Sequence, residues 1–239
     1  MIQHDEIIER KLFEMYDDIQ LGSSDICQNC RNNSENLSFP ATFWFVGKGF
    51  SKSTEKILFV GKNARGNPGK AMGAYLDCRE MADQLCNVSW PYWRYTRNIV
   101  ERVYGNDTID NIAFTNVMKC NTSFTIDTTS NLLKVNCIKE MQVLRKEIEI
   151  IKPKKIIFLT SWYYDEYFKY VFDEIENISN TKISIGKKKM PWWEFKAELN
   201  EIKIEVLRVG HPERKKEIDY VNAVVDWITK QPSISSSVI

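Results

Sequence analysis

Four consecutive apolar residues, followed by a polar and glycine-rich segment, constrain the fold of this chain more than any other feature. Residues 57–60 read Ile-Leu-Phe-Val, and the run ends at Gly61. Such a run is typical of a strand buried on both faces of a parallel sheet. Loops at the carboxyl ends of such strands line the ligand crevice of open α/β sheets. We therefore expect Asn63, Ala64 and Arg65 to lie in a ligand site, with an ordinary strand-to-helix connection as the alternative.

Two familiar phosphate-binding loops are excluded by the glycine spacing. A Walker loop needs GxxxxGK followed by Ser or Thr, but Gly66 is followed by Asn67. A dinucleotide fingerprint needs GxGxxG, and the segment that begins Gly47-Lys48-Gly49 has no third glycine in place. We therefore do not expect a nucleoside triphosphate or a dinucleotide as the ligand.

The composition predicts one soluble domain. The chain has 239 residues, of which 43% are hydrophobic and 27% charged, which is ordinary for a globular protein. No apolar run approaches the ~18 residues of a membrane span, and the N-terminus is charged. We expect a cytoplasmic protein with a single domain over residues 1–230 and a disordered serine-rich tail over 231–239. The net charge of +1 neither favours nor excludes nucleic acid, since a local basic patch is enough for phosphate contacts.

Strand patterns alternate with helix patterns along the chain. Apolar runs predict a short strand at 43–47 and buried strands at 57–60, 111–118, 154–160 and 202–209. Helical spacing predicts helices over about 5–19, 70–86, 92–104, 131–151 and 162–176, with a last helix that ends near 229. This alternation predicts a three-layer α/β/α sandwich with a central, mainly parallel four-stranded sheet.

Polar residues follow the ends of the four buried strands. They are Asn63, Asn116, Ser161 and His211. The carboxyl ends of parallel strands lie at one edge of a sheet, so we expect these side chains to converge there.

Four cysteines form two pairs that could hold a metal. Cys27 and Cys30 make a CxxC in a segment that we expect to be a polar loop, a pattern that serves zinc, iron–sulfur and redox sites. Cys120 follows a predicted strand, and Cys137 lies near the start of the next helix. The alternative is that Cys120 and Cys137 are small buried hydrophobic residues.

Taken together, several segments resemble the uracil-DNA glycosylase superfamily, and within it the iron–sulfur-containing branch. The segments that carry the resemblance are the run 57–61, Phe114-Thr115-Asn116-Val117-Met118-Lys119-Cys120, Cys137 with the helix that ends before Pro153, the run 156–159, and His211-Pro212. The resemblance covers residues from about 27 to 220. It implies the superfamily's fold and a [4Fe–4S] cluster held by Cys27, Cys30, Cys120 and Cys137, with structural zinc as the alternative.

The chain departs from the pattern of that branch at two places. The branch usually has Glu-Ala-Pro-Gly after the first glycine, whereas this chain has Lys62-Asn63-Ala64-Arg65. Asn63 stands where the mismatch-specific branch places its Asn. Glu213 replaces the usual Ser after His-Pro. These departures weigh against uracil as the substrate.

The resemblance implies a monofunctional DNA glycosylase, which hydrolyses the bond between a flipped-out base and its deoxyribose. Asn63 would position the attacking water, and His211 would donate a hydrogen bond to the departing base. Asn116 would pair with the edge of the base, Tyr75 would stack on it, and Ala64 would line its pocket.

Three basic residues are expected at the rim, where they would contact DNA: Arg65, Arg214 and Lys215. A solvated surface role is the alternative for each of them. We expect DNA as the partner, no membrane contact and a monomer.

The small and polar residues of the loop 64–69 favour a roomy, polar base pocket over the tight pocket that uracil needs. The predicted substrate is a cytosine with a bulky polar group at C5, such as the hydroxymethylated or glucosylated cytosine of some phage DNA, removed in anti-phage defence. Two alternatives stay open: a uracil-DNA glycosylase of base-excision repair, and a non-catalytic nucleic-acid-binding module.

Overall fold

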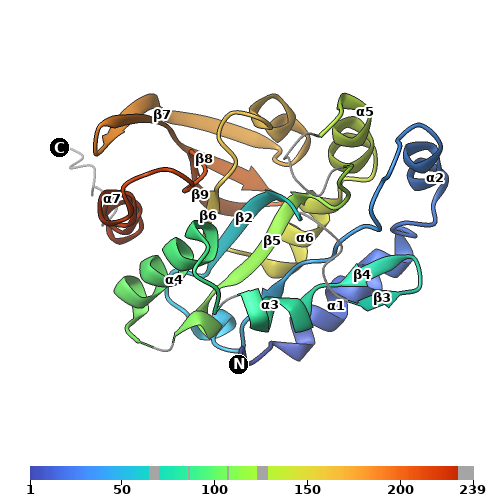
Figure 1. Cartoon of the computed structure of the whole chain (residues 1–239), viewed down its shortest axis with the longest axis horizontal. Coiled ribbons are helices and arrows are strands. Elements are labelled where there is room, and N and C mark those ends of the chain that lie inside the picture. The colour runs from blue at the N-terminus through green and yellow to red at the C-terminus, as the bar shows by residue number, and fades with distance from the viewer. Residues whose placement is uncertain (65–69, 86, 107, 123–128, 231–239) are drawn as a thin grey trace.

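A computed structural model describes residues 1–64, 70–85, 87–106, 108–122 and 129–230, and it is built around one mixed seven-stranded sheet (Figure 1). The strand order is β1-β5-β2-β6-β9-β8-β7. The predicted tail, 231–239, and Arg65 lie outside the described residues. No helix within the described ranges is long and apolar enough to cross a membrane.

The four predicted buried strands form the parallel centre of this sheet. In spatial order they are β5 (Ala113–Met118), β2 (Ile57–Asn63), β6 (Lys155–Phe158) and β9 (Ile202–Val209). Each runs parallel to its neighbour. The α/β class and the mainly parallel centre are therefore confirmed.

The predicted number of strands in the sheet was wrong, because three antiparallel strands extend the parallel centre. β1 (Phe45–Val46), at the predicted short strand, pairs with β5, and the hairpin of β7 (Glu174–Ile185) and β8 (Lys188–Leu199) pairs with β9. The residues of β7 are mostly exposed, so this edge strand carries no buried face for a hydrophobic pattern to reveal. The clearest signal was the two-residue connection that begins at Gly186, whose φ of +57° suits a tight hairpin turn.

Three predicted helices are confirmed. They are α1 (Glu6–Asp18), α4 (Pro91–Tyr104) and α7 (Glu217–Thr229). Pro91 starts α4 at a position where its missing N–H costs nothing, and Gly105 ends the helix with a φ of +95°.

Three other helix predictions were wrong in part. Residues 70–77 form a hairpin of β3 (Lys70–Met72) and β4 (Tyr75–Asp77) that turns at Gly73, and only α3 (Arg79–Leu85) is helical there. The long helix over 131–151 is divided into α5 (Asn131–Lys134), the π-helix η3 (Val135–Glu140) and α6 (Val143–Ile151). Between η3 and α6, Gln142 has a φ of +53°, which breaks the helix. The helix expected over 162–176 is reduced to the 3₁₀ helix η4 (Asp165–Tyr170).

Cys27 and Cys30 lie in a helix and not in the expected loop. This is α2 (Asp25–Asn32), and its N-cap Ser24 accepts a hydrogen bond from the backbone N–H of Cys27. Two further 3₁₀ turns are η1 (Phe50–Lys52) and η2 (Ile109–Asn111).

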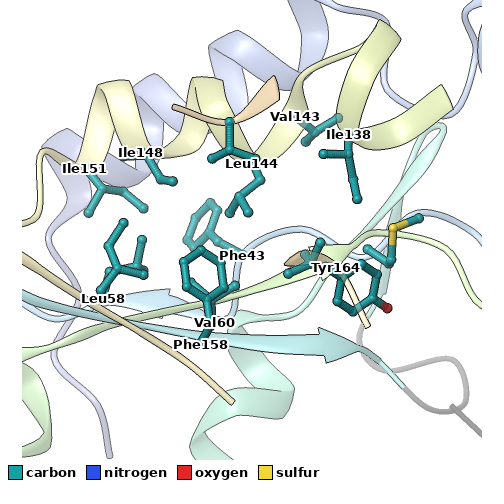
Figure 2. Close-up of a cluster of buried hydrophobic side chains, with 14 of the residues drawn as sticks. Phe43, Leu58, Val60, Ile138, Val143, Leu144, Ile148, Ile151, Phe158 and Tyr164 are labelled. Carbon is teal, nitrogen blue, oxygen red and sulfur yellow. The ribbon is translucent and has the colours of Figure 1, made fainter. Parts of the chain in front are cut away.

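Each face of the sheet is covered by helices, because alternate side chains of the buried strands point to opposite sides. Figure 2 shows one face, where Leu58 and Val60 of β2 lie opposite Leu144 and Ile148 of α6. On the other face, Phe59 belongs to a second cluster with side chains of α4 and α7. These layers bring the carboxyl ends of the parallel strands to one edge between the two helical layers.

Candidate functional site

The candidate site is a group of polar side chains that begins where β2 and β5 lie side by side. Gly61 and Asn116 are register partners, so their side-chain positions face the same side of the sheet. A Cβ atom built on Gly61 would collide with the hydroxyl oxygen of Tyr92 and with Oδ1 of Asn116. The glycine therefore leaves room for two polar groups that lie against the strand. Tyr92 comes from the first turn of α4.

His211 joins this group from the end of β9. Its ring stacks on the ring of Tyr92, with centroids 5.4 Å apart and planes 15° apart. Its backbone N–H donates a hydrogen bond to Oγ of Ser161, which follows β6, at 3.3 Å. Side chains from the ends of β5, β6 and β9 and from the start of α4 are thus linked by contacts.

The hydrogen bonds of His211 fix which ring nitrogen carries the proton. The backbone N–H of Glu213 donates to Nδ1 of His211 at 3.2 Å. Nδ1 must therefore act as an acceptor, and the neutral imidazole carries its proton on Nε2. With this tautomer, Nε2 of His211 is a hydrogen-bond donor.

Two buried amide groups at this edge have unsatisfied hydrogen-bonding atoms. Within the described residues, no partner contacts Nδ2 or Oδ1 of Asn63 or Nδ2 of Asn116. Asn63 lies two residues beyond Gly61 on the same face of β2. Leaving a buried polar group without a partner costs about 1–3 kcal/mol, so such groups usually have a functional reason. A ligand that offers both donors and acceptors would satisfy these amides.

Tyr75 and Ala64, which were predicted to stack on the base and to line its pocket, lie in two different parts of the structure. Tyr75 donates from its hydroxyl to Oδ1 of Asp17 at 2.7 Å and stacks on Phe13 of α1. It lies apart from Asn116, in the core on the opposite face of the sheet. Ala64 is buried directly after β2, and its carbonyl accepts from Nδ2 of Asn121 at 3.0 Å.

The structure places the aromatic ring of Tyr92 beside Asn116 and His211, a role that no pattern in the sequence indicates. It lies in the segment 90–93, whose aromatic residues are typical of core packing. Its place opposite Gly61 depends on how α4 docks against β2, a tertiary contact with no local pattern in the sequence.

Two of the predicted DNA contacts lie close to His211 in the chain. The Arg214 side chain is 82% exposed. Lys215 is half-buried, and burial, helped by the nearby charge of Lys188, lowers the pKa of its ammonium group. Both side chains can present positive charge at the edge of the sheet where His211 lies.

A second group is formed by the four cysteines of the predicted metal site. Cys27, Cys30, Cys120 and Cys137 line one mostly apolar pocket between α2, the end of β5 and η3. Burial raises the pKa of the Cys137 thiol to about 12 and also raises those of Cys30 and Cys120. The four cysteines of the predicted metal site therefore lie around one pocket.

Two of these sulfur atoms accept hydrogen bonds. The backbone N–H of Gly22 donates to Sγ of Cys27, and Nδ2 of Asn136 donates to Sγ of Cys30, both at 3.1 Å. Such donors stabilise thiolates. In the part of the chain that the structure describes, no three His, Cys, Asp or Glu side chains are arranged to hold a single metal ion. Thiolates are ligands that both structural zinc and iron–sulfur clusters use.

Comparison of the chain with protein-family models and with curated proteins gives no match.

Replacing Gly61 with Ala tests whether the close approach of Tyr92 and Asn116 to β2 is real. The added methyl group would overlap the Tyr92 hydroxyl, so we expect a loss of about 1–3 kcal/mol in the free energy of unfolding, measured by urea denaturation. Adding Tyr92→Phe to this variant removes the overlapping oxygen and should recover part of the loss. Tyr92→Phe alone is the control. A Gly61→Ala protein as stable as the wild type would contradict the arrangement.

Proposed function

We propose that this chain is a monofunctional DNA glycosylase that excises a modified base. The observation that carries the proposal is a pair of buried amides at the same strand edge as His211. Within the described residues, Nδ2 and Oδ1 of Asn63 and Nδ2 of Asn116 lack partners. A flipped-out base and an attacking water would supply the donors and acceptors that these amides need.

The chemistry of the reaction assigns a role to each of these side chains. Cleavage of the glycosidic bond leaves positive charge on the sugar and negative charge on the departing base. Nε2–H of His211 would donate to an oxygen of that base and stabilise the negative charge. The Asn63 amide would hold the water that attacks the sugar, since an amide can orient water but cannot act as a strong base. The Asn116 amide would pair with the Watson–Crick edge of the base.

Water is the proposed nucleophile, so the product would be an abasic site in an intact strand. The lysine nearest to Asn63 in the chain is Lys62, and its Nζ lies over the ring of Tyr163, 4.3 Å from the centroid. This ammonium group is held by an aromatic face and is not poised for attack on the sugar.

The proposed substrate is a cytosine with a bulky polar substituent at C5, as in the hydroxymethylated or glucosylated DNA of some phages, and the proposed role is defence against such phages. Asn116 can read cytosine as well as uracil, because its amide group can present either donor or acceptor. The buried residue directly after Asn63 is the small Ala64. A small residue at this place favours a roomy pocket, whereas a uracil pocket needs a wall close to C5.

We further propose that Cys27, Cys30, Cys120 and Cys137 hold a [4Fe–4S] cluster. Four thiolate ligands leave no open coordination position, so the cluster would be structural. It would join α2 and η3 to the end of β5, the strand that carries Asn116.

Iron analysis tests the cluster. We expect protein purified without oxygen to be brown and to contain nearly equal amounts of iron and sulfide. The Cys120→Ala variant should lose most of this iron. The matched control is Cys78→Ala, because Cys78 is also a buried free thiol but does not line the pocket. Colourless wild-type protein with stoichiometric zinc would reject the cluster.

A base-release assay tests the enzymatic proposal. Duplexes with uracil, deaminated purines or modified cytosines are incubated with the protein and then treated with alkali, which breaks the strand at abasic sites. We expect strand breaks only after alkali, and none with an Asn63→Ala/His211→Ala double variant. Equal activity of the double variant and the wild type, or no abasic sites on any substrate, would overturn the proposal.

A further inference from the structure

Two neighbouring aromatic side chains, Trp162 and Tyr163, are exposed just after β6. Their exposed fractions are 60% and 47%, and their rings stack with centroids 5.9 Å apart and planes 20° apart. The next residue, Tyr164, is buried and shares a hydrogen bond with Thr129 at 3.2 Å. Exposed aromatic surface that is ordered in this way commonly marks an interaction site. We call the Trp162–Tyr163 pair the aromatic platform.

A strained turn fixes the aromatic platform relative to His211. Ser161 has a φ of +54°, a left-handed conformation that is unfavourable for a residue other than glycine. The backbone N–H of Ser161 donates to the carbonyl of Val209 at 2.9 Å, and its Oγ accepts from the N–H of His211 at 3.3 Å. The residue directly before the platform is therefore bonded to the segment that carries His211.

Lys62, a residue of β2, contacts the aromatic platform. Its Nζ lies 4.3 Å from the centroid of the Tyr163 ring, and Lys62 directly precedes Asn63. Another ammonium group, that of Lys134 in α5, lies 5.6 Å from the ring of Tyr164. Exposed aromatic rings thus lie beside the positive charge of Lys62, next to Asn63, and this is the combination that single-stranded nucleic acid requires.

We propose that the aromatic platform stacks on an unpaired base of the DNA, next to the flipped-out base, while Lys62 attracts the adjoining phosphate. The choice of DNA as the partner rests on the proposed function. A base inside an intact duplex has both faces covered, so the platform can engage only single-stranded or locally opened DNA. Because every base has an aromatic face, this contact tolerates any sequence. It would hold the opened strand while the target base is in the pocket.

Binding of single-stranded DNA with ordinary bases tests the platform without any excision. Fluorescence anisotropy of a labelled 16-nucleotide strand would be compared with that of a strand of the same length whose central positions are abasic. We expect Trp162→Ala to weaken binding to the first strand about tenfold, the size expected for one lost stacking contact. Trp162→Phe should retain most of the affinity. On the abasic strand, Trp162→Ala should bind as the wild type does.

The control is Trp90→Ala, since Trp90 is also 60% exposed but belongs to the start of α4. It should change affinity less than twofold. Equal affinity of wild type and Trp162→Ala for the strand with bases would overturn the platform, and so would an equal loss on both strands. If Trp162→Ala shows the selective loss but no variant excises a base, the platform stands and the enzymatic proposal fails. If the protein excises a base but Trp162→Ala binds the strand with bases as tightly as the wild type, the enzymatic proposal stands and the platform fails.

Discussion

We expect the His211→Ala variant of the proposed glycosylase to release base about 100- to 1000-fold more slowly than the wild type under single-turnover conditions, which is the usual cost of removing a donor aimed at developing negative charge. This expectation follows from the geometry of the ring. Because the backbone N–H of Glu213 donates to Nδ1, the proton of the neutral imidazole lies on Nε2, the nitrogen proposed to donate to the departing base. Rates would be measured by alkali cleavage of a labelled duplex with enzyme in excess.

The other histidine of the chain provides the control. His4 lies near the N-terminus and hydrogen-bonds through Nδ1 to the buried Glu9 at 2.8 Å. His4→Ala should leave the rate of base release within about twofold of the wild type, although it can lower stability. His211→Gln keeps an N–H donor and should retain more activity than His211→Ala. Equal rates for His211→Ala and the wild type would rule out this role for the ring.

The Lys119→Met variant loses about 3–5 kcal/mol in the free energy of unfolding, because it leaves a buried carboxylate without its charged partner. Nζ of Lys119 lies 2.6 Å from Oε1 of Glu147, and both side chains are fully buried. Thr115 donates to the other carboxylate oxygen at 2.9 Å, and the hydroxyl of Tyr16 also donates to Glu147. This network joins α1 and α6 to β5.

Urea unfolding would measure the loss. The control is Lys139→Met, since Lys139 and Glu140 form an ion pair that is 45% exposed on both sides and should contribute little to the free energy of unfolding. In a Lys119→Met/Glu147→Leu double variant, no carboxylate is left uncompensated, so part of the stability should return. A Lys119→Met protein as stable as the wild type would show that the network does not stabilise the fold.

The sequence predicts the parallel centre of the fold well because that part is governed by burial. β2 and β6 lie between helical layers and must be apolar on both faces, so their runs are visible without any tertiary information. The edge hairpin was missed for the opposite reason. β7 is exposed along most of its length, and its register depends on pairing with β8.

The residues of the candidate site could likewise be predicted from the sequence only in part. Asn63, Asn116, Ser161 and His211 could be named in advance because strand ends of a parallel sheet share one edge. Tyr92 could not, because it reaches this edge from a helix whose docking the sequence does not encode locally.

The cysteine pairs were recognisable by spacing, but the helix that carries the first pair was not. The segment around Cys27 is polar and short, and Ser24 caps it as a helix. Helices of this length depend on packing against the rest of the protein for their stability, so a weak local pattern is expected.

The identity of the released base tests the central proposal most directly. Single-turnover reactions with phage DNA that contains glucosylated hydroxymethylcytosine and with uracil-containing DNA would be run side by side, and the released bases identified by mass spectrometry. We predict release of the modified cytosine, faster than release of uracil and abolished or strongly slowed in His211→Ala. Faster release of uracil, or no release of either base, would contradict the account.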